Sequence, residues 1–290
     1  MGVGGFESRT YSAQDGLCLF YREYGDHALD RPPPHLTPIV CLPGLTRNSA
    51  DFHELALRFS SDRRVIALDY RGRGQSSYDP RPQNYHAAIY ASDLLHLLTA
   101  TNISRAVVVG TSLGGLLAMS LSAQRPTVLA GVVLNDIGPN IDGAGLDNVR
   151  HYLAADLRPR TWDEAATMIK GLSLAAAPDF SEAQWMALAR RSFREGPNGD
   201  IRVDFDPAVA AEFLKAESVP DLWPLYGGLR HVPALAIRGA LSDVLSSATF
   251  DRMAEIKPDL VRVTVPNRGH VPWLDEPECV AALDAFISNL

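Results

Sequence analysis

The sequence has few cysteines and no charge pattern typical of a nucleic-acid-binding protein. Its three cysteines, Cys18, Cys41 and Cys279, are far apart and have no histidine nearby at zinc-ligand spacing. We therefore expect neither a disulfide framework nor a zinc site. The 27 basic and 34 acidic residues give a net charge of −7 without a long block of either sign. This charge pattern excludes DNA and RNA as expected partners.

The N-terminal segment also lacks the basic region and apolar run of a secretory signal peptide. The lack of these signal-peptide features and the odd number of cysteines together predict a cytoplasmic protein. One run, 106–124, contains no charged residue, and its nineteen residues approach the length of a membrane-spanning helix. Its centre, 110–115, is polar and rich in glycine, where a membrane span would be most apolar. We therefore expect no membrane partner and predict that protein buries this run.

Short apolar runs rich in β-branched residues recur along the chain and alternate with amphipathic segments. Such runs are typical of strands buried on both faces, and their alternation with helices predicts an α/β fold with a mostly parallel sheet. The expected strands are 38–42, 65–69, 106–109, 132–134, 234–237 and 261–265, and the expected helices are 49–59, 86–101, 246–256 and 277–290. Two alternating segments, 7–12 and 17–23, predict an antiparallel hairpin at the sheet edge.

The spacing of the predicted strands is uneven. A gap of about 100 residues separates the strand near 132 from that near 235, whereas about 30 residues complete a βαβ unit. We expect a helical cap at 139–229 between two parts of one core, 1–138 and 230–290. Helix starts are predicted at three capping patterns, Thr161–Glu164, Ser181–Gln184 and Asp206-Pro207. The tryptophans of this insertion would either cover a pocket or pack in the insertion's own core: Trp162, Trp185 and Trp223.

The segment Gly110-Thr-Ser-Leu-Gly114 matches the pattern G-x-S-x-G. It follows a predicted buried strand and precedes a helix of small residues, which is the strand-turn-helix setting of a nucleophile elbow. The turn would hold Ser112 in strained backbone angles, and the glycines would let strand and helix approach closely. We therefore predict Ser112 as a nucleophile; the alternative is a Gly-Ser turn without chemistry.

A serine hydroxyl needs a base that accepts its proton and an acid that orients the base. His270 follows the last predicted strand and is the candidate base. Asp243, after the strand 234–237, is the preferred acid. Asp136, at the end of the strand 132–134, is the alternative and would otherwise cap the loop into the insertion. Surface or packing roles are expected for the other histidines: His27, His35, His53, His86, His96, His151 and His231.

A tetrahedral intermediate needs two N–H donors for its oxyanion. One candidate is the backbone N–H of Leu113, directly after the nucleophile. The other is the N–H of Leu45, in the loop that follows the strand 38–42, where Gly44 would let the chain turn close to the substrate.

Patterns for cofactors and metals are incomplete. The segment 72–77 lacks the third glycine of a dinucleotide-binding fingerprint, and Leu57 stands where a zincin-type metal site beginning at His53-Glu54 needs a second histidine. No Gly-Lys-Ser/Thr of a P-loop occurs. We expect neither a cofactor nor a metal ion.

Five ordered motifs make the chain resemble the α/β-hydrolase superfamily, in the branch with a helical cap. They are CLPGL at 41–45, DYRGRGQS at 69–76, GTSLGG at 110–115, RGALSD at 238–243 and RGHVPWLDEPE at 268–278. The resemblance implies an α/β-hydrolase fold with Ser112 as nucleophile, His270 as base, Asp243 as acid, and Leu45 and Leu113 as oxyanion donors. One departure is Pro43-Gly44, where many relatives have His-Gly. A serine nucleophile excludes the chemistry of relatives that use an aspartate.

The resemblance implies a serine hydrolase that cleaves a small carboxylic ester or lactone through an acyl-enzyme. One alternative is a carbon–carbon bond hydrolase of a ring-cleavage pathway, in which Arg190-Arg191 could hold a substrate carboxylate, although a solvated helix face is the favoured interpretation of these arginines. The 10 basic and 14 acidic residues of 138–230 mildly disfavour anionic substrates. The other alternative is a non-catalytic ligand receptor on the same fold. No pattern indicates an oligomeric state.

Overall fold

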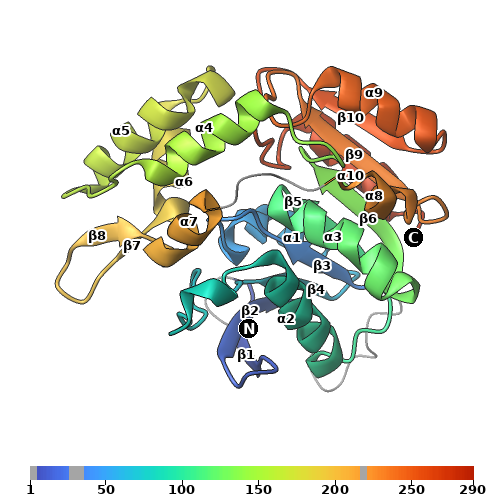
Figure 1. Ribbon diagram of the computed structural model, residues 1–290, viewed down its shortest axis with the longest axis horizontal. Coiled ribbons are helices and arrows are strands. Elements are labelled where there is room, and N and C mark those ends of the chain that lie inside the picture. Colours follow the sequence, from blue (N-terminus) through green and yellow to red (C-terminus); the bar gives the residue numbers. More distant parts are fainter. Residues whose placement is uncertain (1–4, 26–35, 216–220) are drawn as a thin grey trace.

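An eight-stranded sheet forms the centre of the computed structural model, which describes residues 5–25, 36–215 and 221–290 (Figure 1). The strand order is β1-β2-β4-β3-β5-β6-β9-β10. Only the pairs β1–β2 and β2–β4 are antiparallel, so the predicted α/β fold and edge hairpin are confirmed. The strands are β1 Glu7–Ser12, β2 Cys18–Tyr24, β3 Ile39–Leu42, β4 Val65–Leu68, β5 Ala106–Thr111, β6 Leu129–Asn135, β9 Ala234–Gly239 and β10 Val261–Val265.

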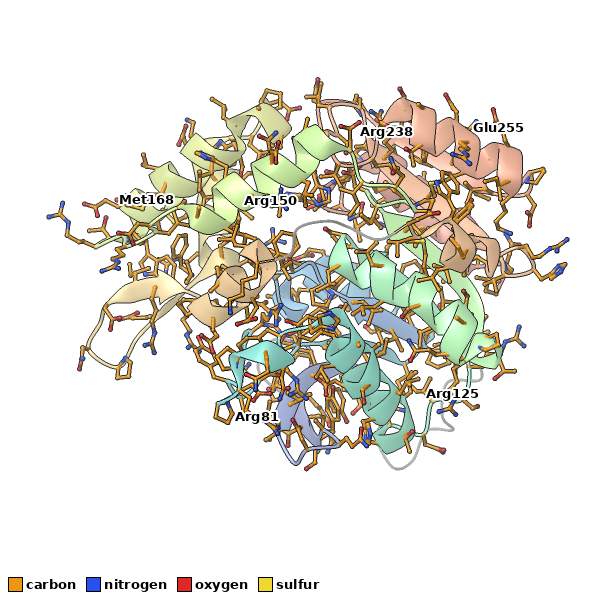
Figure 2. All side chains as sticks on the ribbon, viewed as in Figure 1. Arg81, Arg125, Arg150, Met168, Arg238 and Glu255 are labelled. Atoms are coloured by element: carbon orange, nitrogen blue, oxygen red, sulfur yellow. The ribbon has the colours of Figure 1, made fainter. Side chains whose placement is uncertain are left out.

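The central strands are buried on both faces because helices cover each side of the sheet, and side chains fill the space between the helices and the strands (Figure 2). Every residue of β3, β4, β5 and β6 is buried. Side chains of neighbouring residues alternate between the faces: Val108 joins the apolar cluster of α2, α3 and α9, whereas Val107 and Val109 join that of α1 and α10. These helices are α1 His53–Phe59, preceded by a short 3-10 turn at Ser49–Phe52, α2 Ala87–Ala100, α3 Leu113–Gln124, α9 Ser247–Ile256 and α10 Pro277–Ile287.

The uncharged run 106–124 forms β5, the elbow and α3, and all of β5 and most of α3 are buried. Its lack of charge therefore reflects burial by protein. Over the described parts of the chain, no helix combines the length and apolar character that crossing a membrane would require.

The segment between β6 and β9 is mainly helical, and Figure 1 shows α4, α5 and α6 grouped to one side of the sheet. Thr161 and Asp206 cap helices as predicted, and Ser181 with Gln184 forms a complete capping box. The pair β7–β8 is an antiparallel hairpin that the sequence pattern does not predict. The elements are α4 Gly143–Ala154, α5 Trp162–Ser173, α6 Glu182–Ser192, β7 Phe193–Glu195, β8 Ile201–Val203, α7 Pro207–Leu214 and α8 Trp223–Gly227, with a 3-10 turn at Leu174–Ala176.

The short helix α8 packs on the sheet-flanking helices and not on α4, α5 and α6. Ser122 Oγ of α3 donates a hydrogen bond of 2.9 Å to Leu225 O, and Tyr226 Oη donates one of 2.8 Å to Met253 O of α9. Trp223 lies on this helix, so it is remote from the apolar cluster that Trp185 forms within the insertion.

The start of α3 approaches β3 and β5 without an intervening side chain. A Cβ atom added to Gly114 would lie 2.0 Å from Leu42 O, and one added to Gly110 would lie 2.4 Å from Gly114 O. Real Cβ atoms do not tolerate such distances, so glycine at these positions is a packing requirement. This contact sets the position of the turn that holds Ser112.

Gly114→Ala is expected to lower the free energy of unfolding by about 1–3 kcal/mol or more, because the added methyl group must displace backbone. Gly143→Ala is the matched control, since an added Cβ there meets no atom within 4 Å. The control should change the free energy by less than about 1 kcal/mol. Urea denaturation of both variants measures the difference, and equal stabilities would contradict the packing requirement.

Candidate active site

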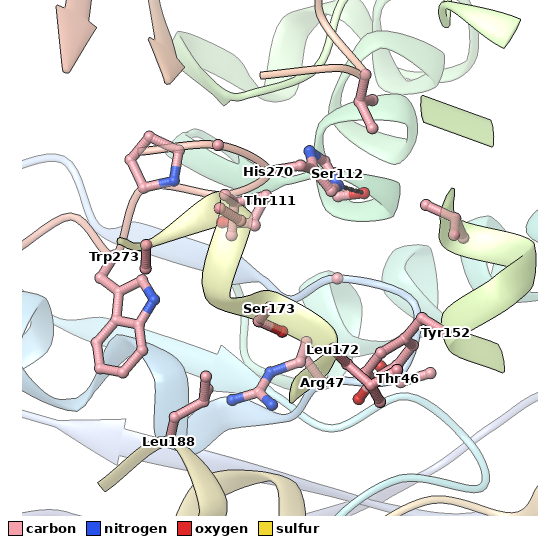
Figure 3. A pocket seen from close by; sticks show the side chains of 18 of the residues that line it. Thr46, Arg47, Thr111, Ser112, Tyr152, Leu172, Ser173, Leu188, His270 and Trp273 are labelled. Carbon is pink, nitrogen blue, oxygen red and sulfur yellow. Dashed lines mark hydrogen bonds between the residues drawn. The ribbon is translucent and has the colours of Figure 1, made fainter. Parts of the chain in front are cut away.

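Ser112 occupies the turn between β5 and α3 with φ 51° and ψ −115°. A positive φ is uncommon for a residue with a side chain and is typical of strained functional turns. The geometry therefore matches the predicted elbow. Ser112 Oγ lies 2.9 Å from His270 Nε2, and Figure 3 shows the two side chains together at the wall of a cavity.

His270 lies in the loop between β10 and α10, and its second ring nitrogen faces a carboxylate. His270 Nδ1 is 2.8 Å from Asp136 Oδ2, and Asp136 is completely buried. An imidazole held in this way presents its Nε2 to the serine. The structure thus brings Ser112, His270 and Asp136 into one hydrogen-bonded chain.

Asp243, the preferred acid in the sequence analysis, does not contact His270. Its Oδ2 instead accepts a 2.6 Å hydrogen bond from Asn148 Nδ2 of α4. The prediction that Asp243 faces the histidine is therefore wrong, and its alternative, Asp136, occupies that place.

The physical reason lies in how the ends of β6 and β9 pack together. The backbone N–H of Asp136 donates to Ile237 O at 2.8 Å, which fixes the turn after β6 beside β9. A turn in which Ser242 N–H donates to Gly239 O then returns the chain toward Asp136. Its carboxylate accepts hydrogen bonds from Gly239 N at 2.8 Å and Ser242 Oγ at 2.6 Å.

The two predicted oxyanion donors belong to segments that meet at the serine. Leu113 begins α3, where backbone N–H groups have no partner within the helix. The loop after β3 passes beside the serine, because a Cβ added to Gly44 would lie 3.8 Å from Ser112 Cβ. Across the described segments, neither the Leu45 nor the Leu113 N–H donates to a protein acceptor.

Arg73 holds the loop that carries Leu45. Its buried guanidinium donates from Nε to Leu45 O at 2.8 Å and from Nη1 to Arg71 O and Tyr90 Oη. Arg73 belongs to the family motif 69–76, but the sequence alone predicts no role for it. The hydrogen bond from Arg73 to Leu45 O suggests that the motif 69–76 orders the loop beside Ser112.

A cavity of about 420 Å³ opens above Ser112 and His270. Side chains of α4, α5 and α6 form one wall, and the loops after β3 and β10 form the other (Figure 3). Trp185 lines it and is also fully buried in the insertion's own apolar cluster, whereas Trp162 and Trp223 do not line the cavity. The fourth tryptophan, Trp273, also lines the cavity.

Two oppositely charged residues in the wall neutralise each other. Arg47 binds Asp51 through Nε to Oδ2 at 2.7 Å and Nη2 to Oδ1 at 2.5 Å, and it also donates to Ser192 Oγ of α6. Burial opposes the charged form of Arg47, but attraction and hydrogen bonding to Asp51 outweigh it, so the pKa lies above its usual value. No sequence pattern predicts this pair.

Among the residues that the structure describes, no group of three or more histidine, cysteine, aspartate or glutamate side chains could hold a metal ion. His27 and His35 lie outside the described residues. His53 packs against Tyr24, whose hydroxyl lies 3.1 Å from its Nδ1, whereas His151 lines the cavity.

Comparison with known proteins tests the family resemblance. A model of the alpha/beta hydrolase family matches residues 39–283. The chain belongs to the alpha/beta hydrolase family. The resemblance inferred from the five motifs is thereby confirmed, and the match runs from β3 into α10.

Three relatives of this alpha/beta hydrolase illustrate the similarity. The crystal structure of an alpha/beta hydrolase from Novosphingobium aromaticivorans is 40% identical, with a TM-score of 0.93 and complete coverage of both chains. A 3-hydroxybutyrate-oligomer hydrolase of Cupriavidus necator is 29% identical over 93% of each chain. A 2-(acetamidomethylene)succinate hydrolase of Mesorhizobium japonicum is 29% identical over 84% of this chain and 85% of that protein.

The contacts of the two aspartates predict different effects of substitution in this alpha/beta hydrolase. Asp136→Asn should slow labelling of Ser112 by a fluorophosphonate by at least about 10²-fold, because the imidazole loses the partner that orients it and stabilises its charge. Asp243→Asn is the matched control and should label at nearly the wild-type rate. Rates are measured by mass spectrometry on folded proteins, and a larger effect at Asp243 would contradict the assignment.

Proposed function

We propose that this alpha/beta hydrolase cleaves a small carboxylic ester or lactone through an acyl-enzyme formed on Ser112. The observation that carries the proposal is the chain of two hydrogen bonds, from Ser112 Oγ to His270 Nε2 and from His270 Nδ1 to Asp136. Such a chain converts a weak nucleophile into one that can attack a carbonyl carbon.

In the first half-reaction, His270 takes the proton of Ser112 as Oγ attacks the carbonyl carbon. Asp136 keeps the imidazole oriented and stabilises the positive charge that it acquires. The carboxylate is itself held by Gly239 N and Ser242 Oγ, so it need not reorganise during the reaction. His270 then gives the proton to the departing alkoxide oxygen, which leaves the acyl group on Ser112.

The negative oxygen of each tetrahedral intermediate would lie between the N–H groups of Leu45 and Leu113. Loss of one such donor typically costs about 2.7–4 kcal/mol of transition-state stabilisation. In the second half-reaction, His270 removes a proton from water, the water oxygen attacks the acyl carbon, and the carboxylic acid leaves as Ser112 regains its proton. No cofactor enters either step.

The volume of the cavity supports the proposal of a small-molecule substrate, because about 420 Å³ lies in the usual range for ligand pockets. The relative from Cupriavidus necator acts, by its name, on an oligomer of 3-hydroxybutyrate; units of a hydroxy acid are joined by ester bonds. This similarity favours ester cleavage within the hydrolase family.

We propose that 139–229 is a cap on a core formed by 1–138 and 230–290, with α8 as the part of that segment that packs on the core. The cap would supply the substrate-facing wall, because α4, α5 and α6 line the cavity.

The free thiols of Cys18, Cys41 and Cys279 are consistent with a reducing cytoplasm.

Ser112→Ala tests the proposal on p-nitrophenyl butyrate. The variant should lose about 10⁴- to 10⁶-fold in kcat, because no other group can form the acyl-enzyme. Ser173→Ala is the matched control, since Ser173 lines the same cavity but makes no contact with His270 in the structure. The control should hydrolyse the ester at close to the wild-type rate.

Release of p-nitrophenol is followed spectrophotometrically, and thermal unfolding shows that each variant is folded. Undiminished turnover by Ser112→Ala would contradict an acyl-enzyme on this residue.

A further inference from the structure

Arg191 is a positive charge in the cavity wall that has no acidic partner at contact distance. It lies near the end of α6, lines the same cavity as Ser112, and its guanidinium carbon is 4.4 Å from the ring centroid of Trp273. Among the described residues, no carboxylate approaches Arg191 within 4.0 Å, and its guanidinium donates no hydrogen bond to protein. Its N–H donors are therefore not used by another described protein group.

The other arginines near this wall differ from Arg191. Arg47 is paired with Asp51 through two hydrogen bonds, so its charge is neutralised within the protein. Arg190, the preceding residue of α6, is exposed, does not line the cavity, and lies 3.8 Å over the ring of Trp162. The interpretation of Arg190-Arg191 as a solvated helix face thus fits Arg190 but not Arg191.

The surroundings of Arg191 make an unpaired charge costly. Burial is the largest influence on it and lowers its pKa, although Asp51, Asp275 and Glu54 attract it from beyond contact distance and Arg47 repels it. Asp51 is already occupied by Arg47. A carboxylate is the ligand group that would offset this cost best, because its two oxygens match the planar fork of the guanidinium.

Apolar side chains lie in the same wall as Arg191 and the neutralised Arg47–Asp51 pair. Phe180 and Trp273 pack edge to face with ring centroids 4.5 Å apart, and Leu188 lines the cavity from the same helix as Arg191. These side chains suit a hydrocarbon segment between the anionic group and the reacting carbonyl.

We propose that the substrate is an aliphatic ester carrying a second, free carboxylate, which Arg191 binds while Ser112 attacks the ester carbonyl. Arg191 is then a specificity-determining residue. The inference deepens the proposed function and rests on it.

Two esters of equal chain length test the proposal: mono-p-nitrophenyl adipate, which ends in a carboxylate, and p-nitrophenyl hexanoate, which ends in a methyl group. The wild-type enzyme should favour the adipate ester in kcat/KM. Arg191→Gln should lower kcat/KM for the adipate ester by about 10- to 100-fold, the effect of losing one charge-assisted contact, and by less than about 2-fold for the hexanoate ester. Arg191→Lys should retain part of the preference.

Arg190→Gln is the matched control and should leave both kcat/KM values unchanged. Equal losses on both esters in Arg191→Gln, or no preference in the wild-type enzyme, would overturn the carboxylate site while leaving ester hydrolysis intact. Hydrolysis of neither ester by the wild-type enzyme would count against the proposed function itself.

A binding measurement tests the site without turnover. Adipate should bind the wild-type protein in isothermal titration calorimetry and bind Arg191→Gln at least about 10-fold more weakly. Equal affinity for the two proteins, or no binding to either, would overturn the role of Arg191, whatever the outcome with esters.

Discussion

The first turn of α3 touches the end of β3 so closely that no Cβ atom fits between Gly114 and Leu42 O. The turn before the helix must therefore be tight, and it holds Ser112 at a positive φ. The same contact puts the unpaired N–H of Leu113 beside the serine and brings the loop of Leu45 next to both. This backbone contact thus sets the nucleophile and the N–H of Leu113, whereas Arg73 holds the loop that carries Leu45. The side chains of His270 and Asp136 complete the arrangement.

Much of the fold could be predicted because its signals are local. The central strands are short β-branched runs whose residues are all buried, and Ser181 and Asp206 cap helices where the capping patterns predict them. Ser112 could be predicted for the same reason, since strand, turn and helix are contiguous in sequence. The hairpin β7–β8 has strands of only three residues each, which are too short to produce a recognisable alternation.

The acid could not be chosen from local signals. Asp136 and Asp243 follow β6 and β9, which are neighbours in the sheet, so both reach the same edge. The choice depends on a turn from Gly239 to Ser242 that directs hydrogen bonds at Asp136 and turns Asp243 toward α4. The sequence raises Arg190-Arg191 as possible ligands of a carboxylate but does not predict which of the two lines the cavity. Arg47, Trp273 and Arg191 come from three distant segments and meet only through packing of the insertion on the sheet.

A crystal structure of the protein after reaction with a fluorophosphonate tests the central claim most directly, because it locates both the nucleophile and the developing oxyanion. We expect phosphorus bonded to Ser112 Oγ, with the phosphoryl oxygen within about 3 Å of the N–H groups of both Leu45 and Leu113. Phosphorus on another residue, or a phosphoryl oxygen directed away from these two amides, would contradict it.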